Sequence, residues 1–143
     1  CGVPVGAFLM TEKVAEKSLT SGDHGTTYGG NPLATCAINK VLDLFEESNI
    51  IENVREITPY FEQKLDEIAA KYDCILTRRG AGFMQGLVFD RPVGPIINKA
   101  IEKGLLLINA GTDIIRFVPS LIITKKDIDD MIVILDEAIK ETI

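Results

Sequence analysis

A glycine-rich stretch near the N-terminus constrains the fold most. Residues 22–30 contain four glycines, the hydroxyls of Thr26 and Thr27 and the single histidine of the chain. Glycine has no Cβ and lets a backbone approach an anion closely, so the stretch predicts a polar loop able to bind phosphate. Asn31 is a favourable N-cap, and Pro32 suits the first position of a helix. The loop should therefore end where a helix begins.

The composition excludes several classes of protein. Apolar residues make up 46% of the 143 residues, which is enough for a packed core. The net charge of −6 makes nucleic acid a poor partner, and no apolar run approaches the roughly 20 residues of a membrane span. Cys1, Cys36 and Cys74 show no metal-ligand spacing, and we expect no metal site. We interpret them as reduced thiols in a cytoplasmic protein.

Helical periodicity dominates the first half of the chain. Residues 11–19 are compatible with a helix, and apolar side chains recur at helical spacing after Pro32 and again from about Glu52 to Ile68. A break is expected near Ser48, and Pro59 should lie inside the second helix and bend it. Residues 2–8 predict a turn that leads into a buried strand.

The second half alternates between strands and helices. The expected strands are 74–77, 83–89, 105–108 and 114–119, and the expected helices are 95–103 and 124–143. The short link at 78–82 favours a hairpin, and Asp127 should complete a capping box with Thr124. This order predicts a compact α+β unit with a mostly antiparallel sheet and helices on one face.

Four stretches resemble class-III pyridoxal-phosphate aminotransferases. Residues 2–7 resemble the strand after the family's cofactor lysine, and 24–33 resemble its phosphate loop. Residues 79–86 resemble its small-domain hairpin, and 109–121 resemble its final strand. Residues 106–111 are typical of the acetylornithine branch of the family. The chain is thus similar to the C-terminal portion of such an enzyme.

The resemblance implies an α/β fragment of the fold type I pyridoxal-phosphate transferases. Residues 1–31 would be the end of the large cofactor-binding domain, with its strand and phosphate loop. Residues 32–72 would be long connecting helices, and residues 73–143 the small α+β domain. The implied cofactor is pyridoxal 5'-phosphate, and the implied partners are a second identical subunit and a small amino-acid substrate.

The resemblance also assigns roles to three residues. Thr27 would bind the cofactor phosphate and reach across the homodimer interface into the neighbouring subunit's site. Thr26 would contact the bound substrate. Arg116 would lie at the edge of the site, also toward substrate, and pair with an acidic residue from upstream. The family's lysine would lie before Cys1, so we expect no catalytic residue in this chain and no activity from the chain alone.

Each of these residues also has an ordinary interpretation. Thr26 and Thr27 are loop hydroxyls, and His24 is better explained as a turn residue that hydrogen-bonds the loop than as a general base. Alternation along the strand points Arg116 away from the apolar face, as for any surface arginine. Arg78 and Arg79 would lie at a solvated hairpin end.

The expected reaction is transfer of an amino group from N-acetylornithine to 2-oxoglutarate, a step of arginine biosynthesis. Ornithine or 4-aminobutyrate aminotransferases of the same class remain alternatives. A non-catalytic α+β module for binding or oligomerisation is a further alternative, although such a module would have no use for the glycine-rich loop.

Overall fold

The computed structural model describes residues 2–20 and 22–143. Cys1 and Ser21 lie outside the described residues, and so does the interpretation of Cys1 as a reduced thiol. The chain divides into two compact units, one ending at Asn49 and the other running from Ile50 to Ile143. Each unit is described by itself.

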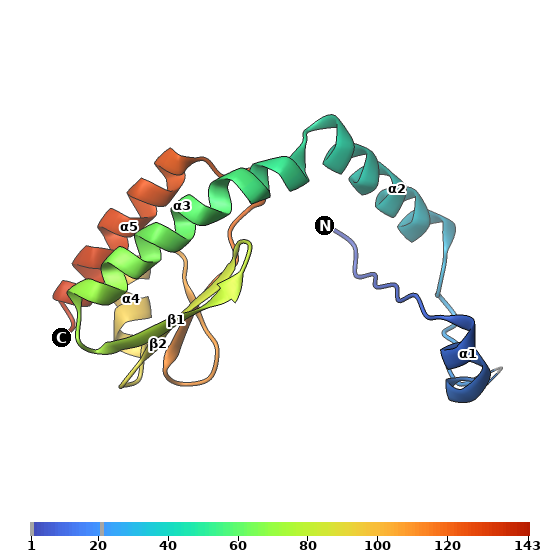
Figure 1. Cartoon of the computed structure of the whole chain (residues 1–143), viewed down its shortest axis with the longest axis horizontal. Helices are drawn as coiled ribbons and strands as arrows, with labels where there is room; N and C mark the ends of the chain where they lie inside the picture. Colours follow the sequence, from blue (N-terminus) through green and yellow to red (C-terminus); the bar gives the residue numbers. More distant parts are fainter. Residues whose placement is uncertain (1, 21) are drawn as a thin grey trace. The chain divides into compact units, whose positions relative to one another are not determined.

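The first unit contains two helices (Figure 1). Helix α1 spans Glu12–Ser18 and helix α2 spans Pro32–Glu47. The strand predicted in residues 2–8 is wrong, because residues 2–10 form neither helix nor strand and are mostly exposed. A strand needs a neighbour to pair its backbone groups, and the described part of this unit contains no strand.

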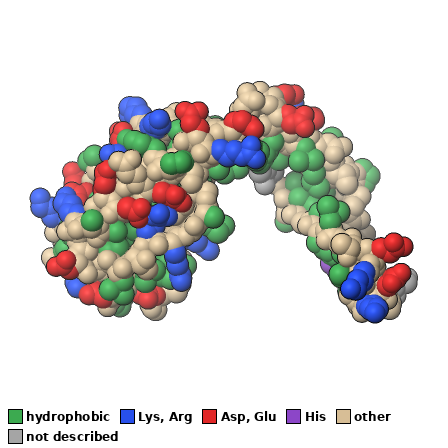
Figure 2. Space-filling view, viewed as in Figure 1, with side chains coloured by type: hydrophobic (Ala, Val, Ile, Leu, Met, Phe, Trp, Pro, Cys, Tyr) green, Lys and Arg blue, Asp and Glu red, His purple; other side chains and the backbone are tan. Residues whose placement is uncertain are grey.

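Helix α2 begins and ends as predicted. The side chain of Asn31 caps it, and Pro32 is its first residue. It ends at Glu47 with Ser48 as its C-cap, and Asn49 then takes a positive φ of 48° that breaks the helix. None of the residues in α1 or α2 is buried. Leu33, Leu42 and other apolar side chains of α2 lie at the surface (Figure 2), so the described part of this unit has no core of its own.

Helix α3 spans Ile50–Lys71 and contains Pro59, as predicted. Proline donates no backbone hydrogen bond. Beside it, the Thr58 hydroxyl donates to the Val54 carbonyl oxygen at 2.6 Å. The bend expected at Pro59 stays a prediction. One face of α3 is buried through Ile57, Phe61, Leu65 and Ile68.

The sheet has four strands in the order β1-β2-β4-β3. They are β1 (Ile75–Ala81), β2 (Met84–Phe89), β3 (Ile108–Asn109) and β4 (Ile114–Phe117). Every pairing is antiparallel, which confirms the expected sheet.

Two details of the predicted strands are wrong. The link predicted at 78–82 is mostly strand, because β1 continues to Ala81 and pairs with β2 throughout. Gly80 makes this possible, since a Cβ there would lie 2.2 Å from the Met84 carbonyl oxygen. The strand predicted at 105–108 begins only at Ile108, because the Leu105 N–H still bonds to the Ala100 carbonyl at the end of α4 (Gly94–Glu102).

Helices α3, α4 and α5 (Lys125–Lys140) bury one face of the sheet. At the centre, the Phe61 ring meets the rings of Phe83 and Phe117 edge to face, with centroids 6.2 and 6.0 Å apart. Thr124 and Asp127 form the predicted capping box at the start of α5. Among the described residues, no helix is both long and apolar enough to cross a membrane.

The face of α5 that packs against the core provides a test of this packing. Leu135 is fully buried, whereas Val133 on the same helix is 59% exposed. Leu135→Ala should lower the free energy of unfolding by about 2–5 kcal/mol, because it leaves a cavity in the core. Val133→Ala should change it by less than about 0.5 kcal/mol. Urea denaturation followed by circular dichroism measures both, and equal losses would contradict the packing.

Candidate functional site

The glycine-rich loop is anchored at its start by Asp23. The backbone N–H and the hydroxyl of Thr20 both donate to the Asp23 carboxylate at 2.8 Å. These two hydrogen bonds stabilise the ionised carboxylate and lower the pKa of Asp23. They close a tight turn just before the segment that carries Thr26 and Thr27.

Thr26 and Thr27 present their hydroxyls to solvent. Both residues are exposed, and within 2–20 and 22–143 neither hydroxyl has a hydrogen-bond partner. The Thr26 carbonyl accepts from the Gly29 N–H at 3.1 Å, which fixes the turn that follows. Gly30 has a φ of +65°, a conformation that favours glycine. The loop therefore holds two adjacent free hydroxyl donors on a constrained turn.

The first turn of α2 offers fewer donors than a typical helix start. Pro32 has no N–H, and the Asn31 side chain accepts from the Ala34 N–H at 2.9 Å. The same amide donates to the Tyr28 carbonyl at 2.9 Å and so ties the loop to the helix. The Thr35 N–H bonds to the Asn31 carbonyl. An anion at this loop would therefore depend chiefly on the threonine hydroxyls.

His24 has a packing role in this loop. Its ring meets the Phe8 ring edge-on, with centroids 4.8 Å apart. Its expected hydrogen bond to the loop is not found among residues that the structure describes. This contact links the segment of residues 2–10 to the loop. Among the described residues, His24 forms no ion pair with a carboxylate.

Arg116 lies on β4 between two buried residues, Ile115 and Phe117. Its side chain is exposed, which confirms the orientation expected from alternation. In the sheet it stands opposite Gly86 on β2 and Ile108 on β3. Thr26 and Thr27 belong to the first unit, and Arg116 belongs to the second.

Arg78 is not at a solvated hairpin end. Its guanidinium is only 20% exposed and contacts two carboxylates of α3, Asp66 at 2.7 Å and Glu62 at 3.4 Å. It also donates to the side-chain oxygen of Gln85 at 3.0 Å, and the Gln85 amide donates to Glu62 and to the Gly82 carbonyl. The hydrogen bond to Asp66 raises the pKa of Arg78. This polar cluster, in which only Gln85 is fully buried, ties the β1–β2 hairpin to α3.

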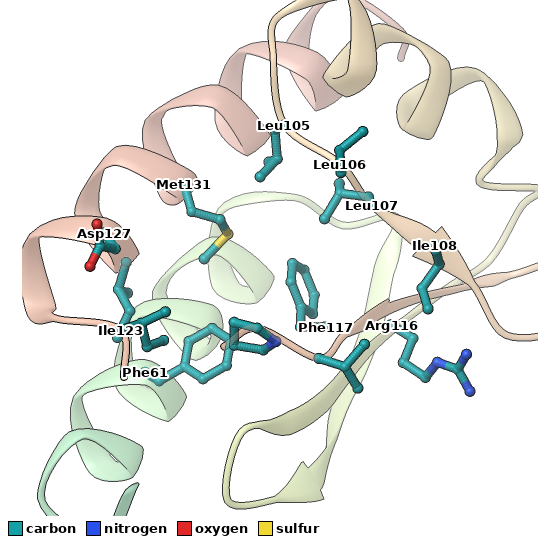
Figure 3. A pocket seen from close by; sticks show the side chains of 13 residues that line it. Phe61, Leu105, Leu106, Leu107, Ile108, Arg116, Phe117, Ile123, Asp127 and Met131 are labelled. Atoms are coloured by element: carbon teal, nitrogen blue, oxygen red, sulfur yellow. The ribbon is translucent and has the colours of Figure 1, made fainter. Parts of the chain in front are cut away.

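An apolar cavity of about 180 Å³ lies beside Arg116 in the second unit. Its walls come from the 105–108 segment, β4, α3 and α5, and include Leu107, Phe117 and Met131. Figure 3 shows Arg116 pointing away from Phe61 and Met131. Asp127 also lines the cavity, but its carboxylate caps Thr124. The cavity therefore offers apolar contact without a free polar group inside it.

No group of three potential metal ligands comes together in the described part of the chain. Cys36 is exposed and Cys74 is buried, and both are free thiols.

The family model for class-III aminotransferases matches residues 1–139. The chain belongs to this family. Class-III aminotransferases depend on pyridoxal phosphate. The match confirms the resemblance drawn from the four motifs, and the α/β fold class expected from them.

Curated relatives of the chain point to the same family. The chain is 41% identical over 140 residues to an acetylornithine aminotransferase of Methanocaldococcus jannaschii, covering 98% of this chain and 35% of the relative. It is 42% identical over 140 residues to the mitochondrial acetylornithine aminotransferase of Saccharomyces cerevisiae, covering 97% and 33%. The chain thus spans about a third of the length of these relatives.

A solved structure shows the same fold. The ornithine aminotransferase of Plasmodium yoelii superposes with a TM-score of 0.80 and 28% sequence identity, covering 87% of this chain and 34% of that one. The aminotransferase fold therefore accounts for most of the chain.

The sequence alone missed the cluster of Arg78 and Gln85. A signal was present, because Glu62 and Asp66 lie on one face of α3 at the spacing of one helical turn. That pattern predicts a shared partner but cannot identify which arginine of the hairpin supplies it.

Proposed function

We propose that these residues form the C-terminal portion of a pyridoxal-phosphate-dependent transaminase that moves an amino group from N-acetylornithine to 2-oxoglutarate. The supporting observation is the family match over residues 1–139 together with acetylornithine aminotransferases among its relatives. On this proposal the whole protein acts in arginine biosynthesis as a cytoplasmic homodimer.

The loop fits a cofactor phosphate. Thr27 is exposed on a constrained turn, and its hydroxyl has no acceptor among the described residues. A hydroxyl in that state can donate to a phosphate oxygen without first breaking a hydrogen bond inside the protein. We assign Thr27 to the cofactor phosphate, in the neighbouring subunit's site. Bound pyridoxal phosphate supplies the electron sink for amino-group transfer.

Thr26 and Arg116 would act on the substrate. Thr26 offers a second free hydroxyl next to Thr27, suited to orienting a bound molecule. Arg116 offers an exposed guanidinium, whose planar donors match a carboxylate. Both residues bind and orient in this scheme, and neither moves a proton.

The proposal keeps three regions: 1–31 as the end of the large domain, 32–72 as connecting helices and 73–143 as the small domain. The lysine of the family would lie upstream of Cys1. Proton transfer needs a base within hydrogen-bond reach of the reacting carbon, and this chain is proposed to supply none. The 143-residue chain alone would therefore be inactive.

Ornithine is a second candidate amine. An ornithine aminotransferase is among the solved structures with this fold, and ornithine therefore stays an alternative amine. The two candidates differ only in the acetyl group on the α-nitrogen, because the side-chain amine has to stay free to be transferred.

A transaminase assay tests the proposed function. The whole protein, loaded with pyridoxal phosphate, should form glutamate from 2-oxoglutarate fastest with N-acetylornithine, compared with ornithine and 4-aminobutyrate. The 143-residue chain should form no glutamate above a control without protein. Failure of the whole protein with all three amines would refute the proposal, and glutamate from the short chain would refute its inactivity.

Replacing Thr27 tests the assignment of the loop. Thr27→Ala should weaken pyridoxal-phosphate binding by about tenfold to a hundredfold, because a hydrogen bond to a charged acceptor is worth roughly 1.5–3 kcal/mol. Thr26→Ala, one residue away, should leave cofactor affinity unchanged and raise the KM for the amine. Cofactor titration by absorbance measures the first effect. Equal affinities for Thr27→Ala and the unchanged protein would leave Thr27 an ordinary loop residue.

A further inference from the structure

Two arginines face each other across a glycine on the sheet. Arg79 on β1 is directly opposite Gly86 on β2, and Gly86 is directly opposite Arg116 on β4. Residues directly opposite each other in antiparallel strands project from the same face. The three residues therefore form one row on one face.

That face is the one without helices. Arg78, next to Arg79, reaches carboxylates of α3, and Gln85, next to Gly86, is buried against the same helix. Because neighbouring residues of a strand point to opposite faces, Arg79 and Gly86 must point away from α3. The burial of the residues on either side of Arg116 leads to the same conclusion for β4. Arg79 and Arg116 are both exposed.

These two arginines differ from the others in the chain. Arg55, Arg78 and Arg91 each form an ion pair with a carboxylate, to Glu52, to Asp66 and to Asp90. Within residues 2–20 and 22–143, Arg79 and Arg116 have no such partner, although acidic residues outnumber basic ones by 21 to 15. Two guanidinium groups without a carboxylate partner among the described residues thus share one face of the sheet.

Gly86, between the two arginines, is buried and has no side chain that could separate them. Across two strand spacings the backbones of Arg79 and Arg116 lie about 10 Å apart, a span over which two arginine side chains can converge. A Cβ at Gly86 would lie 3.3 Å from Ile114 Cγ2, so the Ile114 side chain already borders the space above this glycine. The side chains of Arg79 and Arg116 are exposed on either side of Gly86.

We propose that Arg79 is a second carboxylate-binding residue, which holds one carboxylate of the oxo-acid substrate together with Arg116. This assignment rests on the proposed function, because it concerns a substrate of that reaction. Two guanidinium groups present parallel pairs of donors to one carboxylate, and their charges compensate its desolvation. Arg79 binds and positions the carboxylate and takes no part in proton transfer.

Glutarate, an unreactive five-carbon dicarboxylate, probes this site without any turnover. Isothermal titration of the whole protein should give a dissociation constant that rises about tenfold to a hundredfold in Arg79→Gln. Arg79→Lys should show a smaller rise, because it keeps the charge and loses the planar donors. Arg55→Gln, an exposed arginine on α3, is the matched control and should bind glutarate as the unchanged protein does.

The result separates this proposal from the proposed function. A protein that binds glutarate through Arg79 but forms no glutamate would support the carboxylate site and refute the transaminase. An unchanged dissociation constant in Arg79→Gln would overturn the carboxylate site, even if the enzyme is active. A lowered melting temperature with unchanged glutarate binding would show that Arg79 contributes to stability and not to carboxylate binding, which also overturns it.

Discussion

The packing of α3 and α5 onto one face of an antiparallel sheet supports the second unit. Phe61 of α3 lies at the centre of this contact, with two aromatic rings edge-on to it. Polar contacts hold the two helices at their rims: Tyr60 donates to Asp129 at 2.5 Å, and Lys71 and Tyr72 both donate to Asp136. With its helix face buried, the sheet is free to present its other face, where Arg79 and Arg116 lie.

The first unit has the opposite character. Its helices bury no residue, and Leu9 and Leu33 are exposed. The loop between the helices is nevertheless well specified, by the Thr20–Asp23 turn at its start and the Asn31 cap at its end. Hydrogen bonds therefore order this loop, while the described residues of the first unit give it no apolar core to pack on. That combination suits a binding loop whose apolar flanks are covered by other parts of an assembly.

Local chemistry made much of this predictable from the sequence. The helix caps at Asn31 and Thr124, the break at Ser48 and the buried stripes of α3 and α5 follow from side-chain type and spacing. Features that depend on distant partners were missed. Residues 2–8 have strand-like alternation but no strand to pair with, and Arg78 looked solvated because its carboxylate partners lie 12 and 16 positions earlier. The motifs identified the family, while the row of Arg79, Gly86 and Arg116 required the strand register.

Residues 50–143 carry the core, and the described residues of the first unit carry none. Native-state hydrogen exchange on the 143-residue chain tests this central claim directly. The account predicts slow exchange for backbone amides of Leu65, Leu87, Ile115 and Leu135, and fast exchange throughout α2, because no apolar packing opposes its local opening. Amides of α2 that exchange as slowly as those of α5 would contradict the claim.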